Sequence, residues 1–162
     1  MQHTLSVLVE NKPGVLSRVA DLFSGRGFNI ESLSVAETLD PTVSRMTIVT
    51  RGNDPIIEQI NKQLNKLVNV IKVVDFVNGD FVNREMALIK VNVTDLNRSE
   101  LLNIVDIFRG KVVDVSTDAY VIEVTGDDNK IHAIINLFKP MGIKEVARTG
   151  KVAMMRGNKQ KS

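Results

Sequence analysis

The sequence contains no cysteine and few aromatic residues, and both shortages exclude kinds of chemistry. Without cysteine the chain forms no disulfide, offers no thiolate nucleophile and supplies no sulfur ligand to a metal. Aromatic residues make up 4% of the 162 residues, with one tyrosine and no tryptophan. Sheets that bind single-stranded RNA stack bases on aromatic side chains, so this composition argues against that use.

The sequence also lacks long apolar runs and a strong charge of either sign. No apolar stretch approaches the roughly 20 residues that cross a bilayer. The start, Met1-Gln2-His3-Thr4-Leu5, has neither the charged region nor the apolar core of a signal peptide. The net charge is +2, and we interpret residues 159–162 as a solvated basic tail. We therefore expect a cytoplasmic protein that binds neither nucleic acid nor membrane.

Hydrophobic periodicity indicates the same order of elements in each half of the chain. In the first half, alternating apolar residues predict strands, and apolar residues at helical spacing predict helices. Asp40-Pro41-Thr42 predicts a hairpin turn. The predicted elements are strands over residues 4–10, 28–38, 43–51 and 68–77, a helix over residues 14–25, and a second helix capped by Asp54.

The second half repeats this order with little sequence identity. Its predicted elements are strands over residues 86–93, 112–116, 119–125 and 143–147, a helix capped by Ser99, and a helix that starts at Asp127 or Asp128. The fold class is therefore α+β, with two tandem ferredoxin-like βαββαβ domains. The expected boundaries are a first domain over residues 1–77, a linker over 78–84, a second domain over 85–158 and a tail over 159–162.

Both helices of each domain are expected to cover one face of a four-stranded antiparallel sheet. The first domain has too many apolar strand residues for that single face. These residues are Leu8, Ile30, Val35, Ile48 and Val49. Apolar sheet surface that a domain does not cover itself usually mediates association. We therefore expect a homodimer that joins its sheets edge to edge or face to face.

The link between the first strand and the first helix has the character of an anion site. Pro13 suits the first helical turn because its missing N–H is not needed there. Gly14 has no Cβ, so a ligand can approach the main chain closely. Free N–H groups of Gly14, Val15 and Leu16, together with the helix dipole, favour a carboxylate.

Polar and aliphatic side chains around this link suit an amino acid. Asn11 carries an amide that either caps the helix or accepts an ammonium group, and Asn29 carries a second amide. Leu16, Ile30 and Val35 are candidates for an aliphatic lining. These residues fit a free branched amino acid. The same physics suits another small anion, and Asn-Lys-Pro-Gly is also an ordinary loop and helix cap.

Four longer stretches resemble a known family. The segment LSVLVENKPGVLSRVADLFSGRGFNIESLSV, residues 5–35, resembles the ACT domain, a regulatory module that binds amino acids. The segments QINKQLNKLVNVIKV, DIFRGKVVDVSTDAYVIEVTG and EVARTGKVAMMRG extend the likeness to nearly the whole chain. As a set they resemble the regulatory small subunits of acetohydroxyacid synthase, also called acetolactate synthase.

This resemblance implies a role without catalysis. Small subunits of this family activate a separate large subunit, a transferase, and confer feedback inhibition by valine or a related product in isoleucine and valine biosynthesis. Thiamine diphosphate, Mg and FAD are then expected on the large subunit, with no cofactor, metal or catalytic residue on this chain. The implied partners are the large subunit, a second copy of this chain and the branched-chain amino acid.

In this family the effector lies between two paired ACT domains. One domain contributes the loop and the helix start, and the other contributes the strand that follows the helix. The matching positions in this sequence are Asn11, Pro13, Gly14, Val15 and Leu16 for the first contribution and Asn29, Ile30 and Val35 for the second.

Two other functions share the predicted topology. An RNA-binding ferredoxin-like module, the alternative we retain, would need aromatic residues on its central strands, and LSVLVEN and SRMTIVT contain none. An acylphosphatase-type enzyme would need an arginine in the first loop to hold phosphate, where this sequence has Lys12. Asp127, Asp128 and His132 suggest a hydrolytic or metal site, but a helix cap beside an exposed histidine explains them more simply.

Overall fold

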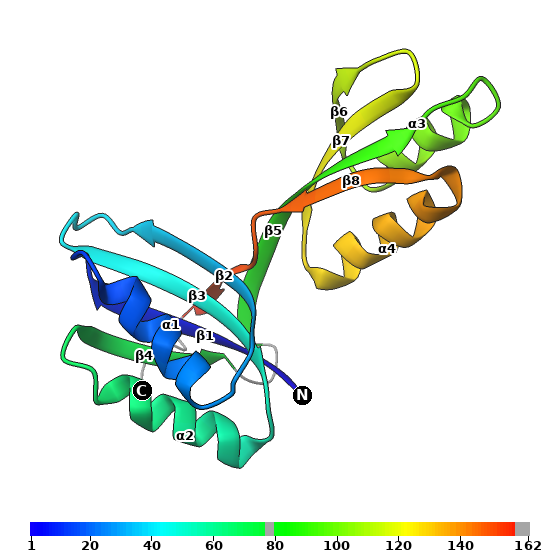
Figure 1. Cartoon of the computed structure of the whole chain (residues 1–162). Coiled ribbons are helices and arrows are strands. Elements are labelled where there is room, and N and C mark those ends of the chain that lie inside the picture. The colour runs from blue at the N-terminus through cyan, green and yellow to red at the C-terminus, as the bar shows by residue number, and fades with distance from the viewer. Residues whose placement is uncertain (77–79, 158–162) are drawn as a thin grey trace. The chain divides into compact units, whose positions relative to one another are not determined.

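The computed structural model describes residues 1–76 and 80–157, and these form two compact units. The first unit contains residues 1–82 together with the chain from Lys151 onward, and the second contains Asn83–Gly150. Figure 1 shows a sheet with its helices in each unit. No helix among the described residues combines the length and the apolar character that crossing a membrane requires.

The first unit is a four-stranded antiparallel sheet with two helices packed on one face (Figure 1). Its elements are β1 (Gln2–Glu10), α1 (Val15–Gly25), β2 (Ile30–Glu37), β3 (Val43–Arg51), α2 (Asp54–Asn65) and β4 (Val70–Phe76). The strand order is β2-β3-β1-β4, so the first strand lies in the middle beside the last. This order is that of a ferredoxin-like unit and confirms the predicted fold.

The second unit repeats the same architecture. Its elements are β5 (Phe81–Asn92), α3 (Arg98–Ile107), β6 (Lys111–Val115), β7 (Ala119–Gly126), α4 (Asp128–Phe138), a short 3-10 helix η1 (Lys139–Met141) and β8 (Ile143–Arg148). The strand order β6-β7-β5-β8 matches that of the first unit element for element. The tandem repeat predicted from the sequence is therefore confirmed.

Each unit has its own apolar core between the helices and one face of the sheet. The core of the first unit comprises Leu5, Val7, Val9, Val15, Val19, Phe23, Met46, Ile48, Ile57, Ile60 and Leu64. These residues recur at alternate positions on the strands and at helical spacing on α1 and α2, as their elements require. Full burial of one such side chain contributes roughly 1.5–3 kcal/mol, which is what holds the helices to the sheet.

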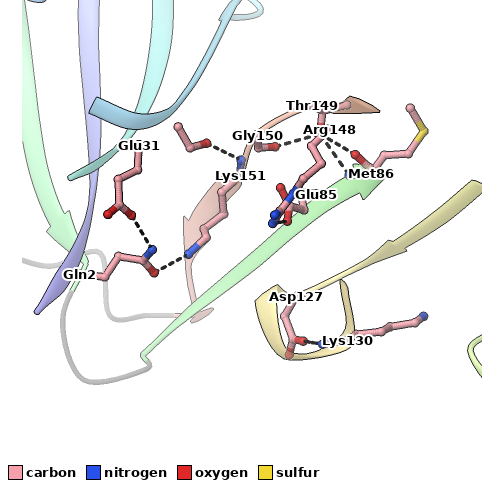
Figure 2. A network of polar contacts seen from close by, with 11 residues as sticks. Gln2, Glu31, Glu85, Met86, Asp127, Lys130, Arg148, Thr149, Gly150 and Lys151 are labelled. Carbon is pink, nitrogen blue, oxygen red and sulfur yellow. Dashed lines mark hydrogen bonds and ion pairs between the residues drawn. The ribbon is translucent and has the colours of Figure 1, made fainter. Parts of the chain in front are cut away.

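A further strand, β9 (Val152–Met155), was not predicted. It pairs with β5 and belongs to the first unit. The main-chain N–H of Lys151 donates to the Ser32 hydroxyl at 3.2 Å. The Lys151 ammonium donates to the side-chain oxygen of Gln2 at 3.4 Å, and Gln2 in turn donates to Glu31 (Figure 2). Lys151 and Ala153 are 6% and 7% exposed, so this segment is packed rather than loose.

The strand β9 changes the expectation of an uncovered sheet face. Ile48 and Val49 are two of the apolar strand residues that were expected to be too many for one sheet face. Ile48 points into the core, whereas Val49 is buried on the other face. Val49 pairs with Ser32, the residue to which Lys151 binds. One cavity lined by Ser6 and Arg45, and a second lined by Arg45 and Thr47, both have Met154 in their walls. The chain's own C-terminal strand therefore covers part of the face that was expected to mediate association.

The predicted domain boundaries shift in two places. Residue 77, the expected end of the first domain, and residues 78 and 79 of the expected linker lie outside the described residues. Residues 81–84 of that linker already belong to β5. The chain rejoins the first unit at Lys151, although the second domain was expected to continue to residue 158. The basic tail over residues 159–162 lies outside the described residues.

Two predicted helix caps are displaced and one is correct. Asn53, not Asp54, caps α2: its side-chain oxygen accepts from the Ile56 N–H at 3.0 Å. The helix α3 begins at Arg98 after Asn97, two residues earlier than a Ser99 cap would place it. Asp127 caps α4 by accepting from the Lys130 N–H at 3.0 Å, as predicted. Neighbouring polar residues compete for the cap position, and local chain geometry decides between them.

Candidate functional site

A tight turn precedes α1. The Val15 N–H donates to the Lys12 carbonyl at 3.3 Å, and Gly14 has φ 84° and ψ −10°. These are the features of a type II turn with Pro13 and Gly14 at its centre, where the second central position requires positive φ and favours glycine. Pro13 therefore precedes the helix, whereas the sequence predicted it in the first helical turn. The Val15 N–H closes the turn and is not the free donor that was expected.

Main-chain donors remain at the start of α1. An α-helix provides no internal acceptor for its first N–H groups, and here these include the N–H groups of Leu16 and Ser17. Gly14, Leu16 and Ser17 are all exposed. A Cβ placed on Gly14 meets no described atom within 4 Å. The helix start is thus open to an anion, with Leu16 and Ser17 as its donors and Gly14 providing access.

Asn11 fastens this loop to the β2–β3 hairpin. Its side-chain N–H group donates to the Pro41 carbonyl at 2.9 Å and to the Glu37 carboxylate at 3.2 Å, and its main-chain N–H donates to the Thr42 carbonyl at 2.8 Å. Among the described residues no side chain caps α1, so Asn11 does not fill that role. Because its nitrogen is committed as a donor, the amide oxygen of Asn11 is the atom suited to an ammonium group.

Glu37 adds a negative charge next to that amide, and the sequence analysis did not include it among the site residues. The only sequence signal was its place at the end of the strand before Asp40-Pro41-Thr42. Its proximity to Asn11 depends on the pairing of β2 with β3 and of β3 with β1. Glu37 is exposed and therefore accessible to a cationic group.

Basic side chains flank the helix start. The Lys12 ammonium lies 2.7 Å from the Glu10 carboxylate. Its hydrogen bond and its charge lower the pKa of Glu10 below the ordinary value of 4.5. The Arg18 guanidinium, one turn into α1, donates to the side-chain oxygen of Asn69 at 2.5 Å. Lys12 and Arg18 are thus engaged by Glu10 and Asn69, and the features that favour an anion here are the exposed N–H groups and the helix dipole.

The aliphatic residues expected around the site separate into two groups. Val15 is 4% exposed and Ile30 is half-buried, and both pack in the core of the first unit. Leu16 and Val35 are 47% and 42% exposed. Within one chain, Leu16 and Val35 therefore offer the accessible apolar surface, whereas Val15 and Ile30 support the fold beneath it.

Asn29 lies far from Gly14 in the same chain. The 11-residue helix α1 separates them, a length of about 16 Å. Asn29 is exposed, and its carbonyl accepts from the Thr50 hydroxyl at 2.7 Å. Thr50 pairs with His3 at the start of β1, whereas Asn11 follows the end of β1. One chain therefore does not bring Asn29 to the loop, and a site containing both requires a second copy.

The strand order, the two-helix layer and the turn before α1 define the first unit as an ACT-type domain. Residues 5–72 match the family described as the AHAS small subunit-like ACT domain, where AHAS is acetohydroxyacid synthase. Residues 84–157 match the family described as the small subunit of acetolactate synthase.

Relatives are similar over nearly the whole chain. The acetolactate synthase small subunit of Aquifex aeolicus is 56% identical over 156 residues, which cover 96% of this chain and 81% of that protein. That of Mycolicibacterium smegmatis is 53% identical over 155 residues, covering 96% and 91%. The crystal structure of the acetolactate synthase small subunit from Thermotoga maritima superposes with a TM-score of 0.89 at 49% identity, covering 98% and 99% of the two chains. The chain belongs to the acetolactate synthase small-subunit family.

Proposed function

We propose that this chain is the non-catalytic regulatory subunit of acetolactate synthase. In this role it binds and activates the catalytic large subunit, which carries thiamine diphosphate, Mg and FAD. It also transmits feedback inhibition by valine or a related branched-chain amino acid. Membership of the small-subunit family supports the partnership, and the open helix start after Gly14 supports the effector site.

The proposed effector lies between two copies of the first unit. Its carboxylate is bound by the N–H groups of Leu16 and Ser17 at the start of α1 in one copy. Asn29 of the second copy supplies an amide oxygen, and Asn11 and Glu37 supply acceptors for the ammonium group. The observation that carries this arrangement is the separation of Asn29 from Gly14 within one chain, with both residues exposed.

Regulation then follows from linkage. An amino acid between two copies changes the activity of the assembly only if it binds one arrangement of the copies more tightly than another. A ligand that contacts both copies has this property because its affinity depends on their separation. A coupling free energy of about 1–3 kcal/mol corresponds to several-fold to roughly hundredfold regulation.

The proposal is tested with the purified chain and the large subunit of the same organism. We expect the chain alone to lack acetolactate synthase activity, to raise the activity of the large subunit, and to make that activity sensitive to valine. Calorimetry of the chain with valine, leucine and isoleucine measures the effector site directly. Absence of activation contradicts the partnership, and absence of heat with all three amino acids contradicts the effector site.

Gly14→Asp and Gly14→Asn form a matched pair for the same test. Both substitutions place a side chain at positive φ, which Asn and Asp tolerate better than other residues, so their backbone costs are similar. Only Asp adds a negative charge where the carboxylate is proposed to bind. We expect Gly14→Asp to weaken valine binding at least tenfold more than Gly14→Asn, with activation of the large subunit retained. Equal effects of the two variants contradict a carboxylate at this helix start.

A further inference from the structure

The first unit contains a cavity of about 380 Å³ on the face of its sheet that α1 and α2 do not cover. Leu8 of β1 lies in its wall, between Val7 and Val9, which both belong to the core. Successive side chains of a strand point to opposite faces of the sheet, so Leu8 faces away from the two helices. The cavity is therefore distinct from the helix start that is proposed to bind the effector carboxylate.

Two basic side chains flank Leu8 on this face. Leu8 pairs with Arg45 of β3 on one side and with Lys72 of β4 on the other, and all three residues line the cavity. Neighbouring strands lie about 4.8 Å apart, so the Cα atoms of Arg45 and Lys72 are about 10 Å apart. Both side chains are long enough to reach one anion between them. Strand pairing therefore brings two cations that are distant in sequence to the same cavity.

Neither cation pairs with a carboxylate within residues 1–76 and 80–157. Arg45 is half-buried, and its Nη1 donates to the Ser6 hydroxyl at 2.7 Å, which leaves further guanidinium N–H groups available. Lys72 is exposed. Asp75 is the one carboxylate in the described wall, and its Oδ1 lies 3.5 Å from Nδ1 of His3. The cavity thus has two cations and one carboxylate that already contacts a histidine.

Arg45 also borders a second cavity, whose wall includes Glu37 and Asp40. The carboxylates of these residues have other partners. Glu37 accepts from the side chain of Asn11 at 3.2 Å, and Asp40 accepts from the Thr42 N–H at 2.9 Å. The charge of Arg45 is therefore not compensated by an ion pair from that side.

Much of the remaining wall is apolar. Met154 and Met155 of β9 line it together with Val74 and Phe76 of β4. Small-molecule sites have volumes of roughly 300–1,000 Å³ and combine apolar walls with a few polar groups. The cavity therefore suits a compound with one anionic end and a short aliphatic part.

We propose that this cavity binds a small aliphatic carboxylate. The guanidinium of Arg45 presents its N–H groups in a planar fork that matches the two oxygens of a carboxylate, and Lys72 adds a flexible donor from the opposite side. Two cations less Asp75 balance one negative charge, whereas a phosphate group carries nearly two. Since β9 supplies Met154 and Met155, the site is complete only while that strand is packed on the first unit.

Methionine methyl groups report on this cavity directly. Of the six methionines in the sequence, Met154 and Met155 line the cavity, whereas Met141 belongs to the second unit. The whole chain, isotope-labelled at its methionine methyl groups, is titrated with sodium butanoate and followed by two-dimensional NMR. Met154→Leu and Met155→Leu identify the two signals. We expect both signals to shift saturably and the Met141 signal to stay in place. Butanamide, a neutral molecule of the same shape, and sodium chloride at equal ionic strength should give no saturable shift.

Matched variants locate the binding. Arg45→Met removes the guanidinium and should weaken butanoate binding about tenfold or more. Arg45→Lys keeps the charge without the fork, so its affinity should lie between those of Arg45→Met and the unaltered chain. Lys72→Met should weaken binding by about twofold to fivefold, because that cation is exposed. Lys66→Met makes the same change at another exposed position of the first unit and should leave the affinity unchanged.

Gly14→Asp separates this cavity from the proposed effector site. The substitution changes the helix start and none of the residues that line the cavity, so butanoate should bind this variant as it binds the unaltered chain. The result does not depend on whether valine binds at the helix start. Loss of butanoate binding in Gly14→Asp would place the carboxylate at the helix start and overturn the proposal.

Three other results would also overturn it. The first is the absence of a saturable shift of the Met154 and Met155 signals with butanoate, and the second is an equal shift with butanamide. The third is unchanged butanoate affinity in both Arg45→Met and Arg45→Lys. An intact signal of Met46, which lies in the core, shows that each variant is folded.

Discussion

The side-chain N–H group of Asn11 donates a 2.9 Å hydrogen bond to the main-chain oxygen of Pro41. This bond holds the loop before α1 against the β2–β3 hairpin, and the 3.2 Å bond to Glu37 reinforces it. The position of the Gly14 turn therefore depends on a hairpin whose residues lie about thirty positions further along the chain. Geometry at the helix start is a property of the whole first unit.

Asn11→Ala is expected to lower the free energy of unfolding by about 1 kcal/mol, because an exposed side-chain hydrogen-bond pair is lost. Asn11→Asp should cost more, since a carboxylate would then face the Pro41 carbonyl and the Glu37 carboxylate. Urea denaturation of the three proteins measures this order, and calorimetry with valine should show weaker binding for both variants. Equal stability of Asn11→Asp and the unaltered chain would contradict the donor role of this amide.

Ala153→Asp is expected to detach β9 from the first unit. Ala153 is 7% exposed, and burying an unpaired carboxylate costs several kcal/mol, more than a four-residue strand can offset. Detachment exposes the peptide bond after Lys151, so trypsin should cleave there many times faster. Met154→Asp is the control, because Met154 is 60% exposed and its replacement should leave the cleavage rate nearly unchanged. Equal cleavage of the two variants would mean that β9 is not packed as described.

Arg148→Met is expected to destabilise the second unit by about 3 kcal/mol. The Arg148 guanidinium pairs with the Glu85 carboxylate (Figure 2), whose side chain is 4% exposed. Removing the cation leaves a buried carboxylate without its partner, which costs far more than the pair contributes. Urea denaturation measures the loss. The double variant Arg148→Met with Glu85→Gln should recover much of it, because no charge then remains buried, and a double variant as unstable as the single one would refute this explanation.

The Glu10 carboxyl should titrate with a pKa below the ordinary value of 4.5, because Lys12 stabilises the carboxylate. A carboxyl group with a lowered pKa in the folded state stabilises the fold above its unfolded pKa, and this contribution disappears as the pH falls through the folded pKa. NMR titration of the Glu10 side chain gives the midpoint directly. Lys12→Met should move the midpoint back toward 4.5, whereas Lys66→Met, a change of the same charge on an exposed residue of the same unit, should leave it in place. An unchanged midpoint in Lys12→Met would assign the shift to another cause.

Local signals in the sequence account for most of the fold. Apolar residues at alternate positions predicted β1, and apolar residues at helical spacing predicted α1, because these periods reflect the geometry of each element alone. Asp40-Pro41-Thr42 predicted the β2–β3 hairpin, and the pair Asp127 and Asp128 predicted the start of α4. The strand β9 escaped prediction because its 4 residues are too few to establish a period.

The candidate site was predictable only in part. The Pro13-Gly14 pair indicated a helix start, but the sequence did not reveal that these residues form a tight turn before the helix, that Val15 closes that turn or that its side chain lies in the core. Glu37 was missed because its distance to Asn11 depends on strand pairing. Asn29 was grouped with the loop because of its amide group and because of the family resemblance, and the structure places the two at opposite ends of the sheet within one chain.

The sequence by itself determined the order of strands and helices, their repetition in two ACT-like halves, and the family to which the chain is similar. These features follow from the spacing of apolar and turn residues that are close in sequence, and a short stretch of chain is enough to show that spacing. Only the tertiary structure decided that β9 packs on the first unit, that Asn11 binds the hairpin, and that Leu8, Arg45 and Lys72 line one cavity. Each of these contacts joins segments that are distant in sequence. Strand register and packing of the whole core decide whether such segments come close in space.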